Sequence, residues 1–356
     1  MLKKIEQLLL RKPTNILGID ISSSSIKLAE VSLKKGRPLL RNIAVSELMP
    51  GIVAEGKIVD VQAATEVLRK LISTSGITYR DTITAVDGQA IFIREVPFPN
   101  MEETEMREAI KWDMENYVPY PPDSYYYDFA VVGPGKNEQE VKVLVVAAQH
   151  AIIDPLVEVM RNAGLRPLAI DIEPLALYRT LPEPENSLVI DIGAKMTQLV
   201  IFQNSSPTVT RTLPIGGQRF DEIIMNVLGL ESSEAESLKQ RQNNLLQRLD
   251  SHSDFTEVHR QMNLLVEELA REIRRTVEYY QMQNREATID NFYLAGGSAN
   301  IDNLAYNLSE LLALTVTVHN PLDFVEVASS FDSNYLNTIA PRLAVAIGLG
   351  LRGGDL

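Results

Sequence analysis

The pattern of apolar and polar positions divides the chain into short strands and amphipathic helices. Apolar runs predict strands at residues 15–21 and 26–32, separated by serines at 22–25 that we interpret as a hairpin turn. Apolar residues at helical spacing predict a helix over 61–75, with Gly76 at the position of its C-cap. The alternation of strands with helices predicts an α/β fold.

The segment from about residue 82 to 170 predicts a compact α/β unit of its own. Strands at 83–86 and 91–96 flank Asp87-Gly88, a dipeptide that favours tight hairpins, so we expect these two strands to pair. An acidic start and helical spacing predict a helix over 102–117. The elements that follow are predicted as strands at 125–132, 141–148 and 168–172 and a helix at 152–164.

The second half begins with strands again and then becomes largely helical. Residues 218–283 are polar and periodic, and their middle part, 231–259, is so rich in Glu, Gln, Asn and Ser that we expect an exposed helical subdomain. The remaining elements are predicted as strands at 188–192, 197–202, 208–214, 291–295 and 315–319 and helices at 301–312 and 341–351.

An internal repeat relates the two halves. Asp20 and Asp191 stand 171 positions apart, and each lies in the sequence Ile-Asp-Ile at the end of a predicted strand. The same shift aligns Leu28 with Leu199 without a gap. Two copies of strand, aspartate, small or polar turn and strand predict two related halves that face one another.

These hairpins have the chemistry to hold a nucleotide. Serine hydroxyls and backbone N–H groups in a tight turn form a concavity that binds anions, and an aspartate at the strand end can hold hydrated Mg²⁺ beside phosphates. Lys27 adds a positive charge close to the first turn, and Gly296-Gly297 follows another predicted strand, where the backbone can approach a ligand. We expect the two hairpins to clamp a nucleoside triphosphate.

Composition narrows the class of protein. The 356-residue chain has a net charge of -13, which argues against a nucleic-acid-binding surface over the whole molecule, and it has no cysteine for disulfides, thiolate metal sites or nucleophiles. The absence of cysteine permits a reducing compartment, and we expect a cytoplasmic protein. The longest apolar run, residues 343–351, is too short to span a membrane. Residues 1–12 combine leucines with Lys and Arg, as in an amphipathic helix for anionic lipid or a partner, or in a frayed end.

Five segments together resemble the nucleotide-binding segments of the actin superfamily of ATPases. In chain order they are residues 18–27 (first phosphate loop), 173–176 (first connecting segment), 191–193 (second phosphate loop), 294–299 (adenosine segment) and 344–350 (second connecting segment). The resemblance implies an actin-like, ribonuclease H-like fold with two lobes.

Within that superfamily the chain is most similar to the PilM family, the FtsA-like cytoplasmic components of type IV pilus assembly machines, which serve twitching motility. The similarity rests on IKWDMENYVPYP at 110–121, PIGGQ at 214–218, and LGL at 228–230 followed by the Glu-rich residues 234–239. It covers the chain from Asn15 onward and explains the α/β unit at 82–170 as an inserted FtsA-type subdomain.

The resemblance implies a division of the chain into several parts. They are an N-terminal segment (1–14), a first lobe (15–81, 171–186 and 340–356), the inserted subdomain (82–170), a second lobe (187–217 and 264–339) and a helical subdomain of that lobe (218–263).

It also implies a set of site residues for ATP and Mg²⁺. Asp20 and Asp191 would orient the metal and its waters. Glu173 would orient or deprotonate the attacking water, or else occupy a favourable helix N-terminus before Pro174. Gly216 and Gly217 would approach the phosphates, or else form a plain strand-to-helix turn. The other cofactor-binding residues implied are Gly18, Ser22, Ser23, Ser24, Ser25, Lys27, Gly193, Lys195, Thr197, Gly296, Gly297 and Ser298.

The second loop departs from the actin pattern. Where active members carry Gly or Asp, this chain has Ala194, Lys195 and Met196. These side chains leave a backbone cradle but argue against fast hydrolysis. We therefore expect ATP binding with slow or no ATPase activity.

Partners follow from the same resemblance. PilM-like proteins bind a short N-terminal cytoplasmic peptide of the membrane protein PilN in a groove beside the inserted subdomain, and we expect that groove between residues 82–170 and their neighbour, with docking of an extended peptide at an exposed edge. Trp112, Tyr117 and the following prolines form either a helix end packed by aromatics or part of the groove lining. PilO, PilC and PilB are further partners, direct or indirect, at the inner membrane, and homo-oligomers are possible.

Two other functions stay open on the sequence alone. A small-molecule kinase of the actin superfamily would need an acidic residue set for a second substrate, which the sequence does not display. An FtsA-like filament former would carry an amphipathic membrane helix after the closing helix.

Overall fold

A computed structural model of the chain describes residues 14–34, 37–88, 91–204, 206–241 and 255–354. The chain divides into two compact units. The first comprises Met1–Pro182, Pro321–Ser333 and Leu343–Leu356, and the second comprises Glu183–Asn320 and Asn334–Arg342. Nearly all of the predicted N-terminal segment, and residues 242–254 of the predicted helical subdomain, lie outside the described residues.

A six-stranded mixed sheet forms the centre of the first unit. Its strand order is β10-β6-β1-β2-β3-β16. The strands are β1 (Asn15–Ile21), β2 (Ser25–Lys34), β3 (Arg37–Glu47), β6 (Asp81–Val86), β10 (Arg166–Ile172) and β16 (Glu326–Val327), and a separate ribbon joins β4 (Val53–Ala54) to β5 (Lys57–Ile58).

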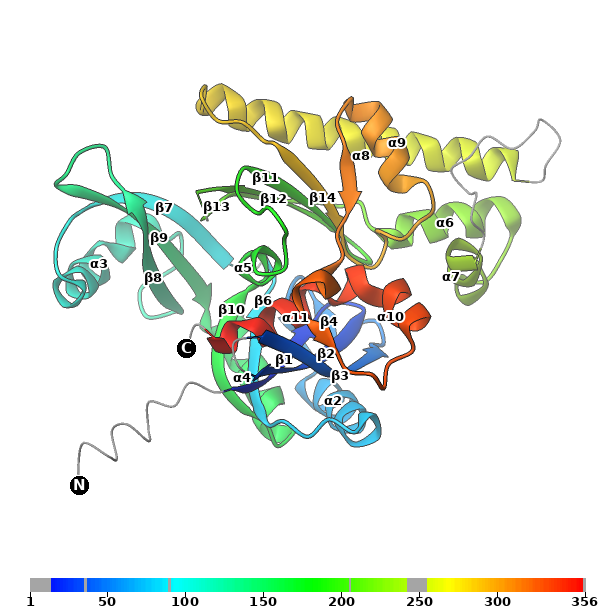
Figure 1. Cartoon of the computed structure of the whole chain (residues 1–356), viewed down its shortest axis with the longest axis horizontal. Helices are drawn as coiled ribbons and strands as arrows, with labels where there is room; N and C mark the ends of the chain where they lie inside the picture. Colours follow the sequence, from blue (N-terminus) through cyan, green and yellow to red (C-terminus); the bar gives the residue numbers. More distant parts are fainter. Residues whose placement is uncertain (1–13, 35–36, 89–90, 205, 242–254, 355–356) are drawn as a thin grey trace. The chain divides into compact units, whose positions relative to one another are not determined.

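Helices cover both faces of this sheet. On one face α2 (Val61–Ser75) and α4 (His150–Asn162) bury their apolar stripes against β1 and β2. On the other face α11 (Ala344–Leu351) runs along β1 and contacts α5 (Glu173–Tyr178) (Figure 1). The α2 helix has the predicted bounds, because the Asp60 carboxylate caps its N-terminus and Gly76 ends it at φ 71°.

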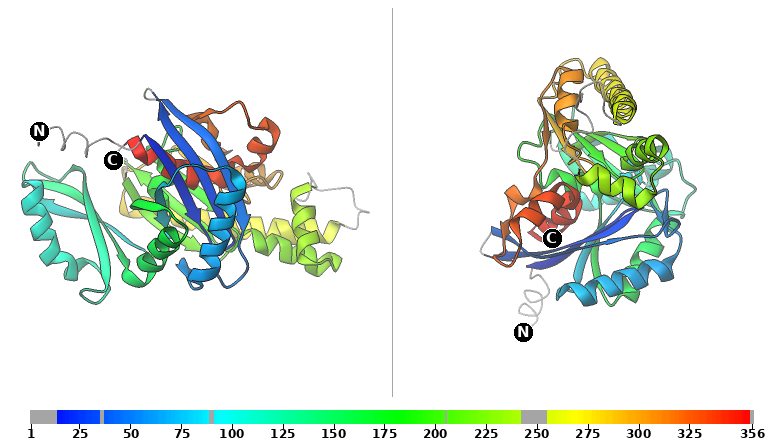
Figure 2. Two further views of the ribbon diagram at one scale, coloured as in Figure 1. Left: turned by 90° about the horizontal axis from the view of Figure 1, so that it is seen from below. Right: turned by 90° about the vertical axis from the view of Figure 1, so that its right-hand side faces the viewer.

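A separate three-stranded sheet belongs to the same unit. Its order is β7-β9-β8, with β7 (Ile91–Pro99), β8 (Tyr125–Pro134) and β9 (Glu140–Gln149). Helix α3 (Glu103–Tyr117) covers one face of it (Figure 2).

The predicted hairpin at Asp87-Gly88 is wrong. Strand β6 pairs in parallel with β1 on one side and β10 on the other, so both of its edges are occupied. Strand β7 therefore leaves for the smaller sheet and pairs with β9. Strands β6 and β10, predicted within the inserted unit, belong instead to the larger sheet.

The second unit is built on a five-stranded sheet in the order β13-β12-β11-β14-β15. Its strands are β11 (Ser187–Ile192), β12 (Thr197–Gln203), β13 (Ser206–Leu213), β14 (Asn291–Ala295) and β15 (Val316–Val318). The remaining helices of the chain are α6 (Gly217–Leu228), α7 (Ser232–Arg241), α8 (Thr256–Gln283), α9 (Leu304–Leu312) and α10 (Ser333–Ile339), with short 3₁₀ turns at Pro321–Phe324, Ala340–Leu343 and Arg352–Gly354. Within the described residues no helix is long and apolar enough to cross a membrane.

The two large sheets repeat one topology. In the first unit β1 pairs antiparallel with β2 and parallel with β6; in the second unit β11 pairs antiparallel with β12 and parallel with β14. The order β3-β2-β1-β6-β10 thus corresponds strand by strand to β13-β12-β11-β14-β15. The sequence repeat around Asp20 and Asp191 is therefore a repeat of structure.

Candidate functional site

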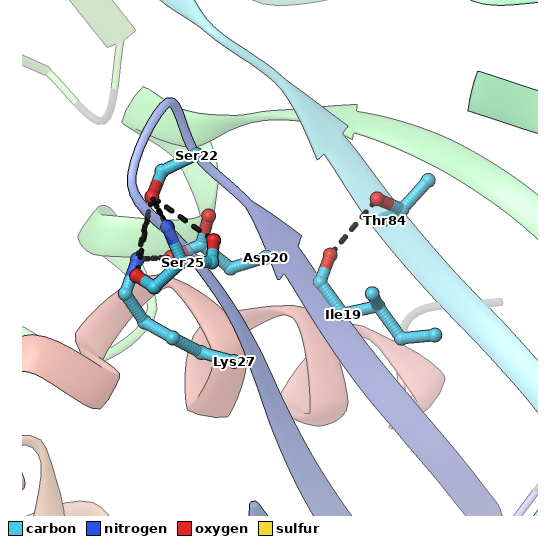
Figure 3. A network of polar contacts seen from close by, with 6 residues as sticks. All are labelled: Ile19, Asp20, Ser22, Ser25, Lys27 and Thr84. Carbon is cyan, nitrogen blue, oxygen red and sulfur yellow. Dashed lines mark hydrogen bonds and ion pairs between the residues drawn. The ribbon is translucent and has the colours of Figure 1, made fainter. Parts of the chain in front are cut away.

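The turn between β1 and β2 gathers a network of polar side chains (Figure 3). Lys27 Nζ donates to Asp20 Oδ2 at 2.7 Å and to Ser22 Oγ at 3.4 Å. Ser22 Oγ also donates to the Ser25 carbonyl at 3.1 Å. Asp20 is 5% exposed and Lys27 is 8% exposed, so the ion pair lies in a largely dry environment. Half-buried Ser23 and Ser24 complete the turn.

Gly18 lets the closing helix approach this hairpin. A Cβ at residue 18 would lie 2.0 Å from the Ala346 carbonyl oxygen, and one at Gly348 would lie 1.9 Å from the carbonyl oxygen of Ala176. Both glycines therefore allow backbone to pack on backbone. Through them α11 holds β1 and α5 together at the back of the turn.

Glu173 lies at the same end of the sheet as Asp20. Strands β1, β6 and β10 are parallel, with Ile19 opposite Thr84 and Ile172 opposite Val86. Glu173 follows β10 directly as the first residue of α5, where the helix dipole favours a carboxylate. The carboxyl ends of parallel strands are the usual place for ligand-binding groups in α/β sheets. The structure thus places both predicted acids of this unit at the expected sheet edge.

The β11–β12 turn forms a backbone cradle in the second unit. The Gly193 N–H donates to the Met196 carbonyl, and the Gly193 carbonyl accepts from the Gly217 N–H at 2.9 Å. A Cβ at Gly216 would meet the Lys195 carbonyl carbon at 2.4 Å. The strand-to-helix turn before α6 can therefore close onto the β11–β12 turn only because residue 216 has no side chain.

The Gly296-Gly297 segment joins this cradle. Gly296 has φ 90°, and a Cβ there would lie 2.3 Å from Asp191 Oδ1. The Ser298 N–H donates to the Ile192 carbonyl at 3.2 Å, and a Cβ on Gly217 would touch the Ser298 hydroxyl. The predicted residues of the second unit, which are far apart in sequence, therefore meet around the carboxyl ends of β11 and β14.

Two predicted residues of this loop differ in their surroundings. Thr197 is fully buried, and its hydroxyl donates to the Ile215 carbonyl, so it braces the strand before the Gly216 turn. Lys195 is exposed in the turn.

Lys239 is a candidate site residue that the sequence reasoning passed over. Its Nζ donates to Asp221 Oδ2 at 2.8 Å and to the Gly217 carbonyl at 3.2 Å, with only 11% of the side chain exposed. The buried Asp221 Oδ1 has no hydrogen-bond partner among the described residues. The Glu-rich segment 234–239 carried the family resemblance, but only the structure brings its lysine to the glycine cradle.

A buried histidine, His319, follows β15. His319 is 2% exposed, and its backbone N–H donates to the Leu294 carbonyl. Burial lowers the pKa of His319 from 6.5 to about 4. The ring is therefore neutral at physiological pH and serves packing beside Tyr293.

No cluster of three or more His, Asp or Glu side chains able to hold a metal occurs among the residues that the structure describes. A Mg²⁺ ion beside Asp20 or Asp191 would complete its shell with water and phosphate oxygens, as this ion commonly does.

A pocket of about 730 Å³ lies within the first unit, beside the three-stranded sheet. It is walled by β8, β9, α4 and the end of β10, and its apolar lining includes Val146, Val157 and Ile170. Among the described strands, β8 pairs only with β9, so its outer edge is open. The acidic groups of the lining are Asp128, Asp154, Glu158 and Asp171, and its cation is Arg161.

Trp112 does not take part in this pocket or in a packed helix end. Its side chain is 80% exposed on α3, and residues 110–121 are absent from the pocket lining. The buried face of α3 is formed by Met106, Ile110 and Met114. Of the predicted helix end, Tyr117 does pack, together with Tyr120, Tyr125 and Tyr127, beside the core that α3 covers.

The repeated sheet topology with its two strand-turn hairpins defines a protein of the actin-like class. The chain belongs to the family described as "Type IV pilus assembly protein PilM", whose sequence profile matches residues 18–354.

Known relatives agree with this assignment. A solved structure of the "PilM-PilN type IV pilus biogenesis complex" has a chain 30% identical to this one, with a TM-score of 0.81 over 96% of this chain and 99% of that chain. The cell division protein FtsA of Bacillus subtilis is 24% identical over 374 residues, 94% of this chain and 82% of that protein. MreB 5 of Spiroplasma citri bound to AMPPNP shares the fold, with 13% identity and a TM-score of 0.54 over 96% of both chains.

Proposed function

We propose that this protein is an ATP-binding scaffold on the cytoplasmic face of the inner membrane that binds the N-terminal cytoplasmic peptide of PilN. Family membership supports the role in pilus assembly. The pocket beside β8 and α4 is the observation that carries the peptide-binding role. Contacts to PilO, PilC or PilB would then follow through PilN or directly.

The chemistry of the pocket defines the peptide it would take. Aliphatic side chains line its floor. Of its four carboxylates, Asp171 is buried and pairs with Arg179 and Arg352, and Asp128 pairs with Arg107. Asp154 and Glu158 are therefore the acidic groups of its rim that form no ion pair with a described residue. An extended segment that combines aliphatic residues with Lys or Arg would therefore fit both the floor and the rim. The open edge of β8 offers backbone hydrogen bonds to such a segment, as in β-strand addition.

The test is a binding titration with a synthetic PilN N-terminal peptide. Ile170→Asp puts a charge on the apolar floor and should abolish binding. Leu168→Asp is the matched control, because Leu168 lies on the same strand but is exposed and outside the lining. Glu158→Lys should weaken binding by removing an acidic group from the rim. Equal affinities for the two aspartate variants would refute this site.

Features within each unit, taken separately, support a nucleotide ligand. In the first unit the ammonium group of Lys27 is a buried cation at the β1–β2 turn, suited to bind a phosphate oxygen. In the second unit Gly216, Gly217 and Gly296 let the segments around the β11–β12 turn pack so closely that a Cβ at any of them would clash. Lys239 adds a cation beside Gly217. These features favour a ligand with phosphates.

Magnesium would neutralise phosphate charge between the ligand and Asp20 or Asp191. Glu173, at the carboxyl end of β10, would orient or deprotonate the attacking water. The side chains Ala194, Lys195 and Met196 in the second turn favour retention of the nucleotide over fast turnover. We therefore assign slow or no ATPase activity to the protein.

A further inference from the structure

The exposed face of α3 carries an unusual combination of side chains for a surface helix. Trp112 is 80% exposed. Helical spacing places Glu105, Glu108 and Glu115 on the same face, at one or two turns from it, and all three are exposed. We call these four residues the Trp112 face. Large exposed aromatic side chains are typical anchors of protein interfaces.

The face keeps an excess of acidic charge: exposed Lys111, three positions after Glu108 and four before Glu115, is a single cation beside three carboxylates. Arg107 of the same helix is engaged elsewhere: it pairs with Glu103 and Asp128 and lies over the Phe129 ring. Glu105, Glu108 and Glu115 form no ion pair with any described residue. An occupant should therefore be cationic and should also offer aliphatic side chains to the indole.

The chain itself contains such a segment, and neither the fold nor the proposed function makes use of it. Residues 1–12 precede the described structure. Their apolar residues are Met1, Leu2, Ile5, Leu8, Leu9 and Leu10, their cations are Lys3, Lys4, Arg11 and Lys12, and their single acid is Glu6. Charge and apolarity are thus complementary to those of the Trp112 face.

The topology of the first unit bears on which copy of the segment binds. Strands β1 and β6 are parallel, with Leu17 opposite Thr82. The chain leaves the carboxyl end of β6 for the sheet that α3 covers, whereas the segment before Asn15 joins the amino end of β1. The segment and α3 therefore depart from opposite ends of the large sheet. This arrangement favours contact with a second molecule.

We propose that residues 1–12 of one copy bind the Trp112 face of a second copy. The contact is heterologous, because segment and face are different surfaces, so it generates rings or open chains of molecules. Its ion pairs are solvent-exposed and screened by salt, so the association is weak and salt-sensitive. It is independent of the peptide pocket and of nucleotide.

Trp112 is the only tryptophan of the chain, so its fluorescence reports on this face alone. The full-length protein should show an indole emission that shifts to the blue as concentration rises and returns to the exposed position at high salt. A segment variant, with Lys3, Lys4, Arg11 and Lys12 changed to Glu, should lose the concentration dependence.

A complementation experiment provides the decisive result. The face variant carries Glu105→Lys, Glu108→Lys and Glu115→Lys with Trp112→Phe. It therefore has no tryptophan fluorescence but keeps residues 1–12 intact. Mixed with the segment variant, it should restore the blue shift, because one intact segment meets one intact face. The control is a full-length chain with Glu66→Lys, Glu138→Lys and Glu286→Lys, which has the same net charge as the three changes on the face and should associate as wild type does. A chain with only Glu105→Lys, Glu108→Lys and Glu115→Lys should associate about tenfold or more weakly.

Three results would overturn the proposal. The wild-type emission could be independent of concentration and salt. The mixture of the face variant and the segment variant could show no blue shift of the Trp112 emission. Anionic vesicles of phosphatidylserine and phosphatidylcholine could bind wild type but not the segment variant while the Trp112 emission stays unchanged, which would assign the segment to a lipid surface.

Discussion

Asp20 and Lys27 face each other across the β1–β2 hairpin, with Lys27 Nζ 2.7 Å from Asp20 Oδ2. The repeat in the second unit keeps the carboxylate, because Asp191 occupies the matching position, but Gln198 replaces the lysine opposite it. The buried Gln198 Oε1 has no partner among the described residues. The two hairpins therefore share a backbone but differ in charge, and only the first carries a cation at this position.

Removal of the Asp20 carboxylate should strongly destabilise the protein. Asp20→Ala leaves the nearly buried Lys27 ammonium without its counter-ion, and loss of one partner of a buried pair costs about 3–5 kcal/mol. Urea denaturation measures this change. Asp20→Ala combined with Lys27→Met should recover most of the loss, since the uncompensated charge is gone. Equal stabilities for the single and double variants would contradict this role of the pair.

Mg-ATP should stabilise the folded protein. A ligand present at about 100 times its dissociation constant, and bound only by the folded state, adds about 2.7 kcal/mol to the free energy of unfolding. Gly217→Ala should lose this increment, because the new Cβ would lie 2.4 Å from the Ser298 hydroxyl and would push residues 296–298 away from the β11–β12 turn. Thermal denaturation with and without Mg-ATP measures the difference.

Gly133→Ala is the control for that experiment, because a Cβ at Gly133 meets no atom within 4 Å. It should respond to Mg-ATP as wild type does. A full response of Gly217→Ala would place the nucleotide away from the glycine cradle.

His319 should make the protein less stable in mild acid. Its pKa is lowered from 6.5 to about 4 by burial, so the unfolded chain binds a proton between these values while the folded protein does not. The contribution is fully present above pH 6.5 and is lost as the pH falls toward 4. Between pH 6.5 and 5 the loss from this one residue is about 2 kcal/mol. His319→Gln should flatten this part of the profile, and parallel profiles for both proteins would contradict the assignment.

The sequence alone was sufficient for the parts of the fold that depend on local pattern. The helix Val61–Ser75 has a cap at each end and an uninterrupted apolar stripe. In each of the two Ile-Asp-Ile hairpins, the strands that pair are consecutive in the chain. Short-range signals of this kind do not need the rest of the chain. The same holds for the prediction of the actin-like class, because five short segments in a fixed order carry it.

Features decided by distant partners could not be predicted. Strand β3 (Arg37–Glu47) was missed because its mixed polar pattern becomes a strand only beside β2. Asp87-Gly88 favoured a hairpin locally, but β6 has two parallel neighbours from elsewhere in the chain. Lys239 reaches Gly217 only after α6 and α7 pack together. The exposure of Trp112 likewise depends on which face of α3 packs against the three-stranded sheet.

The most direct test of the central claim is hydrogen–deuterium exchange of the full-length protein with and without the PilN N-terminal peptide. Backbone amides of β8 and α4, which wall the pocket, should exchange more slowly when the peptide is bound, while those of α3 and of the second unit stay unchanged. Protection confined to α3 or to the second unit, or no protection at a saturating concentration of peptide, would contradict the proposed role of the pocket.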